Sequence, residues 1–219
     1  MRKLVFSFLL ASSVLAWADD ANISSPDGKL QVTVTTNGGR VYYSAMLDGK
    51  EMLVPSALGL KTSIGDFTRD LTLMESQSED VNYTYTMRGT KSSGAEYKAN
   101  RMTMKFHNKD NMQMSIVFQV SNNNIAFRYE LPRQEYQHKD MKRVRITSEL
   151  SSFNLPEGTT TFISPQIGPE TGWEQTKPSY EEVYSADAPM ATASRYGHGY
   201  IFPSLFHTPS GWVLVSETG

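Results

Sequence analysis

The stretch PSYEEVY places two adjacent carboxylates, Glu181 and Glu182, between Tyr180 and Tyr184. Calcium takes carboxylate oxygens from flexible loops, so this stretch contains candidate calcium ligands. On an extended segment Glu182 shares one face with the two tyrosines and Glu181 points the other way, which predicts different roles for the two acids. Together with Trp173, the tyrosines also offer rings that can stack on a sugar. The alternative is a solvated acidic patch on a loop.

Other catalytic chemistries have little support from residue spacing. The four histidines, at 107, 138, 198 and 207, are expected in turns or irregular segments, and no Gly-x-Ser-x-Gly elbow marks a nucleophile. No histidine pair has the i, i+4 spacing of a metal site. A sugar epimerase needs a histidine and a carboxylate facing one pocket, and His198 or His207 with Glu217 is the candidate set for that reading.

The elements that must position these residues are predicted to be short antiparallel strands. Apolar and polar residues alternate in the ranges 30–35, 41–43, 102–106, 112–120 and 125–131. This period of two is typical of half-buried strands, and no long helical stripe competes with it. Turn signals stand between the ranges, including Asn37-Gly38-Gly39 and Asp48-Gly49. The pattern predicts an all-β sandwich or barrel.

Three further features complete this prediction. The methionines at 102, 104, 112 and 114 alternate on two paired strands, which favours core packing over a soft-metal site. Residues 164–211 are rich in Pro, Gly and Ser and are expected to hold few regular strands, as in a functional or docking loop. Residues 212–215 predict a strand that looks central in its sheet. A chain that stops just after such a strand is expected to be a piece of a longer protein.

The first 18 residues have the pattern of a secretory signal peptide. Arg2 and Lys3 precede an apolar run at 4–15, and Ala16-Trp17-Ala18 offers a small-x-small cleavage site. The run is shorter than the roughly 18–20 apolar residues of a membrane span. The lack of cysteine favours a bacterial exported protein, so the mature domain, 19–219, is expected in the periplasm. No basic block is present, which argues against nucleic acid as a partner.

Four segments, taken in order, resemble the N-terminal domain of family 97 glycoside hydrolases. SPDGKLQVTVTTNGGRVYYSAMLDGKEMLVPSALGL resembles the family's opening strands and hairpins, and VFQVSNNNIAFRYELP its strand, polar turn and Ala-Phe-Arg-Tyr. SYEEVY resembles its aromatic-Glu-x-x-Tyr motif. HTPSGWVLVSETG resembles its closing strand and glutamate. The resemblance runs from Ser25 to Thr218 and so covers essentially all of the mature chain.

The resemblance implies an antiparallel β super-sandwich of the galactose-mutarotase type. In the whole protein a (β/α)8 barrel with the catalytic carboxylates and a small β domain would follow it. Such enzymes hydrolyse α-linked gluco- or galacto-oligosaccharides and bind calcium. On this likeness Glu181 would be a calcium ligand lent to the barrel, and Glu217 a substrate-binding residue at the domain junction. This chain alone would lack the catalytic carboxylates and would be inactive.

A stand-alone carbohydrate-binding module is the main alternative, because super-sandwich domains occur in glycosidases, epimerases and binding proteins alike. An open platform of the rings at 173, 180, 196 and 200 would favour the binding module. Burial of these rings under loops, with Glu181 left free, would favour a docking domain.

Overall fold

The computed structural model describes residues 19–89, 91, 93–132, 143–168 and 182–217, which form fifteen β-strands. Within these residues there is no helix, and therefore no helical segment that could cross a membrane. The expected signal peptide, residues 1–18, lies outside them. The predicted all-β class is confirmed.

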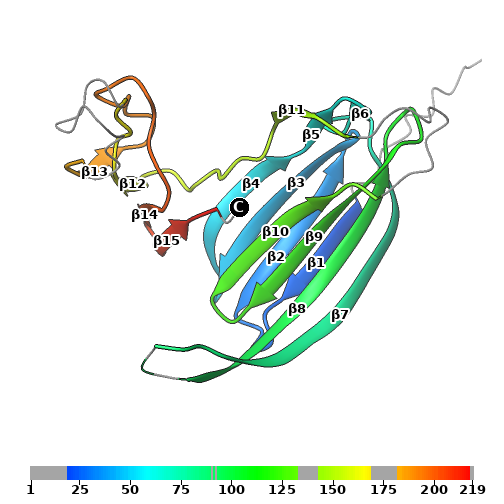
Figure 1. Ribbon diagram of the computed structural model, residues 1–219, viewed down its shortest axis with the longest axis horizontal. Coiled ribbons are helices and arrows are strands. Elements are labelled where there is room, and N and C mark those ends of the chain that lie inside the picture. Colours follow the sequence, from blue (N-terminus) through cyan, green and yellow to red (C-terminus); the bar gives the residue numbers. More distant parts are fainter. Residues whose placement is uncertain (1–18, 90, 92, 133–142, 169–181, 218–219) are drawn as a thin grey trace, which may run out of the picture.

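Two four-stranded antiparallel sheets form a sandwich (Figure 1). The first sheet consists of β1 (Asp19–Ser24), β2 (Leu30–Asn37), β3 (Arg40–Leu47) and β4 (Lys50–Leu58). The second consists of β7 (Thr72–Thr86), β8 (Gly94–His107), β9 (Gln113–Ser121) and β10 (Asn124–Glu130). Each sheet is a meander in which strands that follow one another in sequence are also neighbours in space. This is why local turn signals predicted most of the pairing.

The core lies between the facing sides of these two sheets. Apolar side chains at alternate positions point into it, as the period of a strand requires. The fully buried side chains include Val32, Val34, Tyr43, Met102, Met104, Phe106, Met114, Ile116 and Phe118. Each large side chain removed from water contributes about 1.5–3 kcal/mol. The predicted core role of the methionines is confirmed, with Met112 partly buried beside the cluster.

Two predicted hairpin turns are present where the glycines required them. Gly38 and Gly39, with φ of 56° and 72°, connect β2 to β3. Asp48 and Gly49, with φ of 49° and 73°, connect β3 to β4. Two-residue loops with positive φ at both positions match the right-handed twist of the flanking strands. These turns therefore set the register of the first sheet.

The β7–β8 hairpin extends beyond the rest of the sandwich as a two-stranded ribbon (Figure 1). Strand β7 is exposed along most of its length, so it lacks the alternation that revealed the other strands. On the ribbon Tyr83 lies opposite Tyr97, with ring centroids 5.1 Å apart, and Tyr85 is 6.1 Å from Tyr83. Cross-strand aromatic pairs of this kind stabilise a ribbon that has no third strand.

Two smaller sheets flank the sandwich. One contains β5 (Leu60–Thr62), β6 (Gly65–Asp66) and β11 (Ile146–Glu149). The other lies to one side of the sandwich and contains β12 (Thr160–Ile163), β13 (Ser185–Pro189), β14 (Ser204–Thr208) and β15 (Gly211–Val215) in the order β13-β12-β14-β15 (Figure 1). We call this last sheet the lateral sheet.

Among the described residues of the range 164–211 there are two short strands, β13 and β14, so the expectation of few regular strands there is confirmed. Two other expectations are corrected. Among the described strands β15 is at the edge of its sheet, not at the centre. The sequence suggested a central strand because β15 has apolar residues on both sides, as a buried strand does. Two histidines are also on strands instead of in turns: His107 ends β8 and His207 lies in β14.

Candidate functional site

The described chain resumes at Glu182, in the middle of the PSYEEVY stretch, and continues into β13. The candidate calcium ligand Glu181 lies outside the described residues, as do Trp173 and Tyr180. The described part of the site therefore consists of Glu182, Tyr184 and the side chains that they contact.

The carboxylate of Glu182 is held inside the domain. Its side chain is only 12% exposed, and Oε2 accepts a hydrogen bond of 3.2 Å from the hydroxyl of Tyr196. The guanidinium of Arg195 lies 3.9 Å from the same oxygen and donates a 3.0 Å hydrogen bond to the carbonyl of Val183. Because the guanidinium also lies over the Tyr196 ring, 4.8 Å from its centroid, the three side chains form one cluster. We call it the Glu182 latch.

The latch joins the segment before β13 to the loop after it. Glu182 and Val183 precede β13, whereas Arg195 and Tyr196 lie in the loop between β13 and β14. An almost buried carboxylate is stable only when charge and hydrogen bonds compensate its lost hydration, and the latch supplies both. Glu182 is thereby committed to an internal contact and is not a free acid.

Tyr184 fixes the other end of the stretch. Its ring stacks on that of Phe162 in β12, with centroids 5.1 Å apart and planes inclined by 19°. Stacked rings contribute about 0.5–1.5 kcal/mol beyond the area they bury. Latch and stack together hold residues 182–184 against the lateral sheet.

The other candidate residues are not brought together. Glu217 is exposed, two residues beyond the end of β15. His207 stacks on Trp212, with centroids 4.2 Å apart and planes inclined by 11°, and His198 is exposed in the loop before β14. In the part of the chain that the structure describes, neither histidine makes a hydrogen bond or ion pair with Glu217, so the epimerase reading gains no support.

The described rings of the proposed sugar platform do not form an open aromatic surface. Tyr196 and Tyr200 are half-buried, and their hydroxyls donate to Glu182 Oε2 and to the carbonyl of Thr192. The described residues also contain no group of three His, Cys, Asp or Glu side chains that could hold a metal ion.

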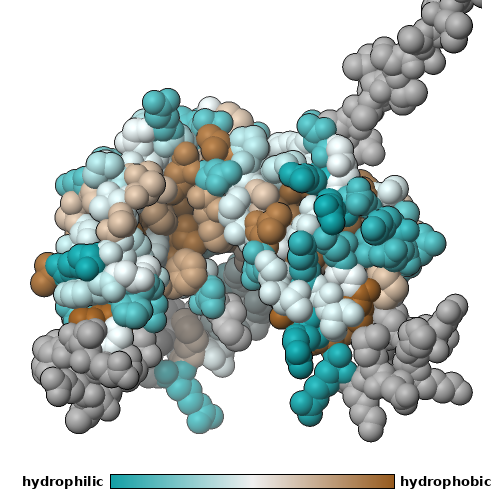
Figure 2. Space-filling model, turned by 90° about the horizontal axis from the view of Figure 1, so that it is seen from above, coloured by the Kyte–Doolittle hydropathy of each residue, from teal (hydrophilic) through white to brown (hydrophobic). Residues whose placement is uncertain are grey.

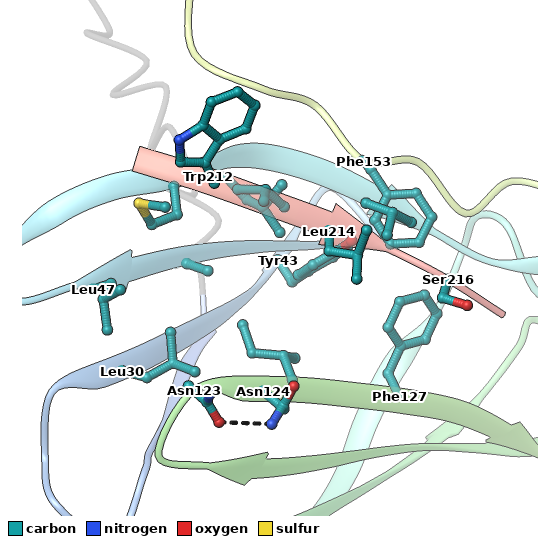
Figure 3. Close-up of a pocket in the computed structure, with 16 residues that line it drawn as sticks. Leu30, Tyr43, Leu47, Asn123, Asn124, Phe127, Phe153, Trp212, Leu214 and Ser216 are labelled. Carbon is teal, nitrogen blue, oxygen red and sulfur yellow. Dashed lines mark hydrogen bonds between the residues drawn. The ribbon is translucent and has the colours of Figure 1, made fainter. Parts of the chain in front are cut away.

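A cleft that sequence reasoning missed opens between β15 and the sandwich (Figure 3). It has a volume of about 200 Å³. The sandwich contributes apolar walls that include Tyr43 and Phe127, and β15 contributes Trp212 and Leu214. A signal was present in the run Trp-Val-Leu-Val at 212–215, because a strand that is apolar on both sides needs cover on both sides.

Fold and site together define a two-sheet β sandwich with a lateral sheet that presents an acidic and aromatic segment. Residues 23–219 match the family model described as "Glycosyl-hydrolase 97 N-terminal". The chain therefore belongs to this family, and the predicted family and super-sandwich fold are both confirmed.

Two curated relatives are α-galactosidases. The chain is 23% identical over 195 residues to a probable retaining alpha-galactosidase of Streptomyces bingchenggensis, covering 89% of this chain and 27% of the relative. It is 23% identical over 192 residues to a retaining alpha-galactosidase of Bacteroides thetaiotaomicron, covering 85% and 27%. The chain thus spans about a quarter of the length of these relatives.

Solved structures show the same fold. The crystal structure of a beta-arabinopyranosidase superposes with a TM-score of 0.83 at 44% identity, over 92% of this chain and 32% of that one. A family 97 glycoside hydrolase of Pseudoalteromonas sp. strain K8, in complex with panose, superposes with a TM-score of 0.70 at 22% identity, over 86% and 27%.

Proposed function

We propose that this domain serves an exported, calcium-dependent glycosidase that acts on galacto-configured glycosides, with β-arabinopyranosides as the first candidates. The observation that carries the substrate class is the 44% identity to a β-arabinopyranosidase over 92% of the chain. The α-galactosidase relatives agree with it. A β-L-arabinopyranoside has the ring configuration of an α-D-galactopyranoside without its hydroxymethyl group, so one type of pocket suits both. The relative bound to panose, a glucose trisaccharide, is only 22% identical, and that likeness supports the fold alone.

In this proposal Glu181 is one calcium ligand of a site shared with the catalytic part of the longer protein. Calcium takes about six to eight oxygen ligands, so one glutamate does not make a site. Glu182 is bound inward by the latch and so is not available to an ion, which leaves Glu181 as the acid proposed to meet ligands from the catalytic part. The bound ion would orient and polarise the sugar beside the catalytic acids.

The Glu182 latch would then act as a positioning device. Its hydrogen bonds tie the backbone next to Glu181 to the loop that carries Arg195 and Tyr196. A ligand on a restrained backbone loses less conformational entropy when calcium binds. Glu217, exposed after β15, is proposed to contact substrate at the junction with the catalytic part. The domain by itself would be inactive, because the catalytic carboxylates would lie in the longer protein.

The test uses the full-length protein with the variants Glu181→Gln and Glu217→Gln, and Glu157→Gln as a matched control at an exposed glutamate. After treatment with a chelator, calcium binding is measured by calorimetry. Glu181→Gln should weaken calcium binding at least about tenfold, because affinity follows the number of charged ligands. Glu217→Gln should raise KM and leave calcium affinity unchanged. The control should match the wild type in both measurements.

Rates with β-L-arabinopyranoside, α-D-galactopyranoside and α-D-glucopyranoside test the substrate class. The first two should be hydrolysed and the third poorly. A preference for glucoside would overturn the substrate proposal, and unchanged calcium binding in Glu181→Gln would overturn the ligand assignment. If the domain alone bound oligosaccharide without calcium, it would be a carbohydrate-binding module.

We also propose that residues 1–18 are removed on export to the periplasm. All fifteen described strands, from β1 at Asp19 onward, lie after the proposed cleavage site, so cleavage there would remove none of them. Mass spectrometry of the protein from a periplasmic fraction should find Asp19 as the N-terminus. A cytoplasmic protein that keeps Met1 would contradict the proposal.

A further inference from the structure

The outer part of the β7–β8 ribbon has an aromatic side and a polar side. Residues directly opposite one another on antiparallel strands share a side, and so do residues two apart on one strand. Tyr83 lies opposite Tyr97, and Tyr85 is two residues from Tyr83, so the three rings share one side. We call these three tyrosines the ribbon rings. The opposite side is polar and carries Asn82, Thr84, Glu96 and Lys98.

The ribbon rings are open to solvent on a hairpin that extends beyond the sandwich (Figure 1). Tyr83 is 51% exposed and Tyr85 40%, and Tyr97 is half-buried beside them. The planes of Tyr85 and Tyr97 are inclined by 47° and 36° to that of Tyr83, so the rings form a stepped row instead of a closed stack. In the described part of the chain the hydroxyls of Tyr83 and Tyr85 make no hydrogen bond. Ring surface and hydroxyls are therefore both available to a ligand.

A chain of hydrogen bonds holds one end of this row in place. Gln119 in β9 donates a 2.8 Å hydrogen bond from Nε2 to the hydroxyl of Tyr97. Its Oε1 accepts two hydrogen bonds, of 3.2 and 3.1 Å, from the guanidinium of Arg101, which donates another of 2.8 Å to Glu79. We call these contacts the Gln119 network. Because they fix Tyr97 before a ligand arrives, less conformational entropy is lost on binding.

The charges on this side of the ribbon are already paired. Arg101 pairs with Glu79, and further along Lys105 pairs with Glu75 at 2.8 Å. These pairs offer no unpaired charge to a nucleic acid, a phosphate or an acidic peptide. A neutral ligand rich in hydroxyls fits better. The C–H groups on the face of a pyranose pack on the negatively polarised face of an aromatic ring, and its hydroxyls can bond those of the tyrosines.

A protein partner suits the ribbon rings less well. An aromatic side chain buries about 150–250 Å², and about half or less of each ring remains to be covered. The ribbon rings by themselves therefore supply far less than the about 800 Å² that each partner contributes to a stable protein interface. Seen from above, apolar surface gathers instead in the hollow between the two halves of the molecule (Figure 2), and the ribbon rings line no part of the cleft beside β15.

We propose that the ribbon rings and the Gln119 network form a sugar-binding site, which holds a chain of neutral pyranose units on the surface of the domain. The inference goes beyond the proposed function, because the site lies on a different sheet from the one that the Glu182 latch adjoins and needs neither calcium nor Glu181. A site of this kind raises the effective concentration of a chain-like substrate at the enzyme that carries it.

The test is native electrophoresis of the full-length protein in gels that contain galactan, galactomannan or amylopectin, which are neutral polysaccharides. Retardation at increasing polysaccharide concentration gives a Kd, and at least one of the three should retard the wild type. Tyr83→Thr removes a ring but keeps a residue that is favourable in strands, and should raise this Kd about three- to tenfold. Tyr83→Phe keeps the ring and should stay within about twofold of the wild type.

Two further variants separate loss of a ring from damage to the ribbon. Tyr85→Thr removes a ring that lies opposite Ala95 and so breaks no cross-strand ring pair, and it should weaken retardation like Tyr83→Thr. Met74→Ala is the matched control, because Met74 is another exposed apolar side chain of β7, at 57%, and retardation should not change. No retardation by any of the three polysaccharides, or equal retardation of the wild type and both threonine variants, would overturn the proposal.

Two other measurements distinguish this site from its rivals. Hydrolysis of nitrophenyl β-L-arabinopyranoside needs no chain-like substrate, so the threonine variants should keep the wild-type kcat/KM. If the full-length protein neither bound calcium nor hydrolysed glycosides but Tyr83→Thr still lost retardation, the proposed function would fail and the surface site would stand. If Tyr83→Thr changed the oligomeric state in size-exclusion chromatography, the rings would meet a second copy of the chain, and the sugar site would be rejected.

Discussion

The hydroxyl of Tyr196 donates a 3.2 Å hydrogen bond to the carboxylate of Glu182 and so joins the loop before β14 to the segment before β13. The carboxylate is almost buried, and its other partner, Arg195, is 3.9 Å away. The tyrosine hydroxyl is therefore the nearer of the two groups that compensate a desolvated charge.

Removal of that hydroxyl should weaken the domain. Tyr196→Phe leaves one carboxylate oxygen without its hydrogen bond, and we expect a loss of about 1–3 kcal/mol in the free energy of unfolding, measured by urea denaturation. Tyr200→Phe is the matched control, because its hydroxyl bonds only the Thr192 carbonyl on a more exposed part of the same loop. Equal effects of the two substitutions would argue against a special role for the latch.

Two adjacent glycines should respond differently to alanine. Both have positive φ, but a Cβ at Gly39 would lie 2.9 Å from the backbone of Asp70, whereas one at Gly38 would meet nothing within 4 Å. Gly38→Ala should cost about 1–2 kcal/mol for the left-handed conformation alone. Gly39→Ala should cost clearly more, because the backbone at Asp70 must also move. Thermal unfolding of both variants makes the comparison, and a smaller loss for Gly39→Ala would contradict it.

Tyr129 should make stability fall in alkali. Its hydroxyl accepts a hydrogen bond from the Gly59 amide and bonds Ser151, and burial raises the pKa of Tyr129 to about 12 from 10.0. The folded pKa lies above the unfolded one, so this contribution is complete below pH 10 and is lost as the pH rises through about 12. Tyr129→Phe should lose about 1–3 kcal/mol at neutral pH, because the Gly59 amide is left unsatisfied.

Urea denaturation at increasing pH distinguishes this from a general alkaline effect. The difference in unfolding free energy between wild type and Tyr129→Phe should shrink as the pH rises above 10. A difference that stays constant up to pH 12 would show that the buried hydroxyl is not the group responsible.

Asp66 should make the stability of the fold decrease in acid. Burial raises the pKa of its carboxyl, but two hydrogen bonds from Thr68 and the charges of Lys61 and Arg69 outweigh it, so the net pKa lies below 3.8. The stabilisation is therefore present above pH 3.8 and is lost as the pH falls through the lowered pKa. Asp66→Asn should cost about 1 kcal/mol at neutral pH and progressively less in acid. A constant cost across that range would refute the assignment.

The local pattern of the sequence was enough to predict most of the sandwich. Alternation in β2, β8 and β9 and the glycine turns around β3 are short-range features, and meander sheets pair strands that are already adjacent in sequence. The ribbon strand β7 escaped prediction because it is solvated on both sides and has no apolar period. The ordered family motifs supplied the assignment to glycoside hydrolase family 97, which no single pattern could have supplied.

The tertiary structure decided what the chemically suggestive residues do. Composition and spacing made Glu181 and Glu182 equivalent in charge, and only the approach of Tyr196 and Arg195 from a later loop shows that Glu182 is bound inside the domain. The surroundings of Phe162 likewise depend on β12, β14 and β15 meeting side by side, which brings Phe162 across from residues more than 40 positions away. Sequence period fixes which side of a strand a residue occupies, whereas only long-range pairing fixes what that side will meet.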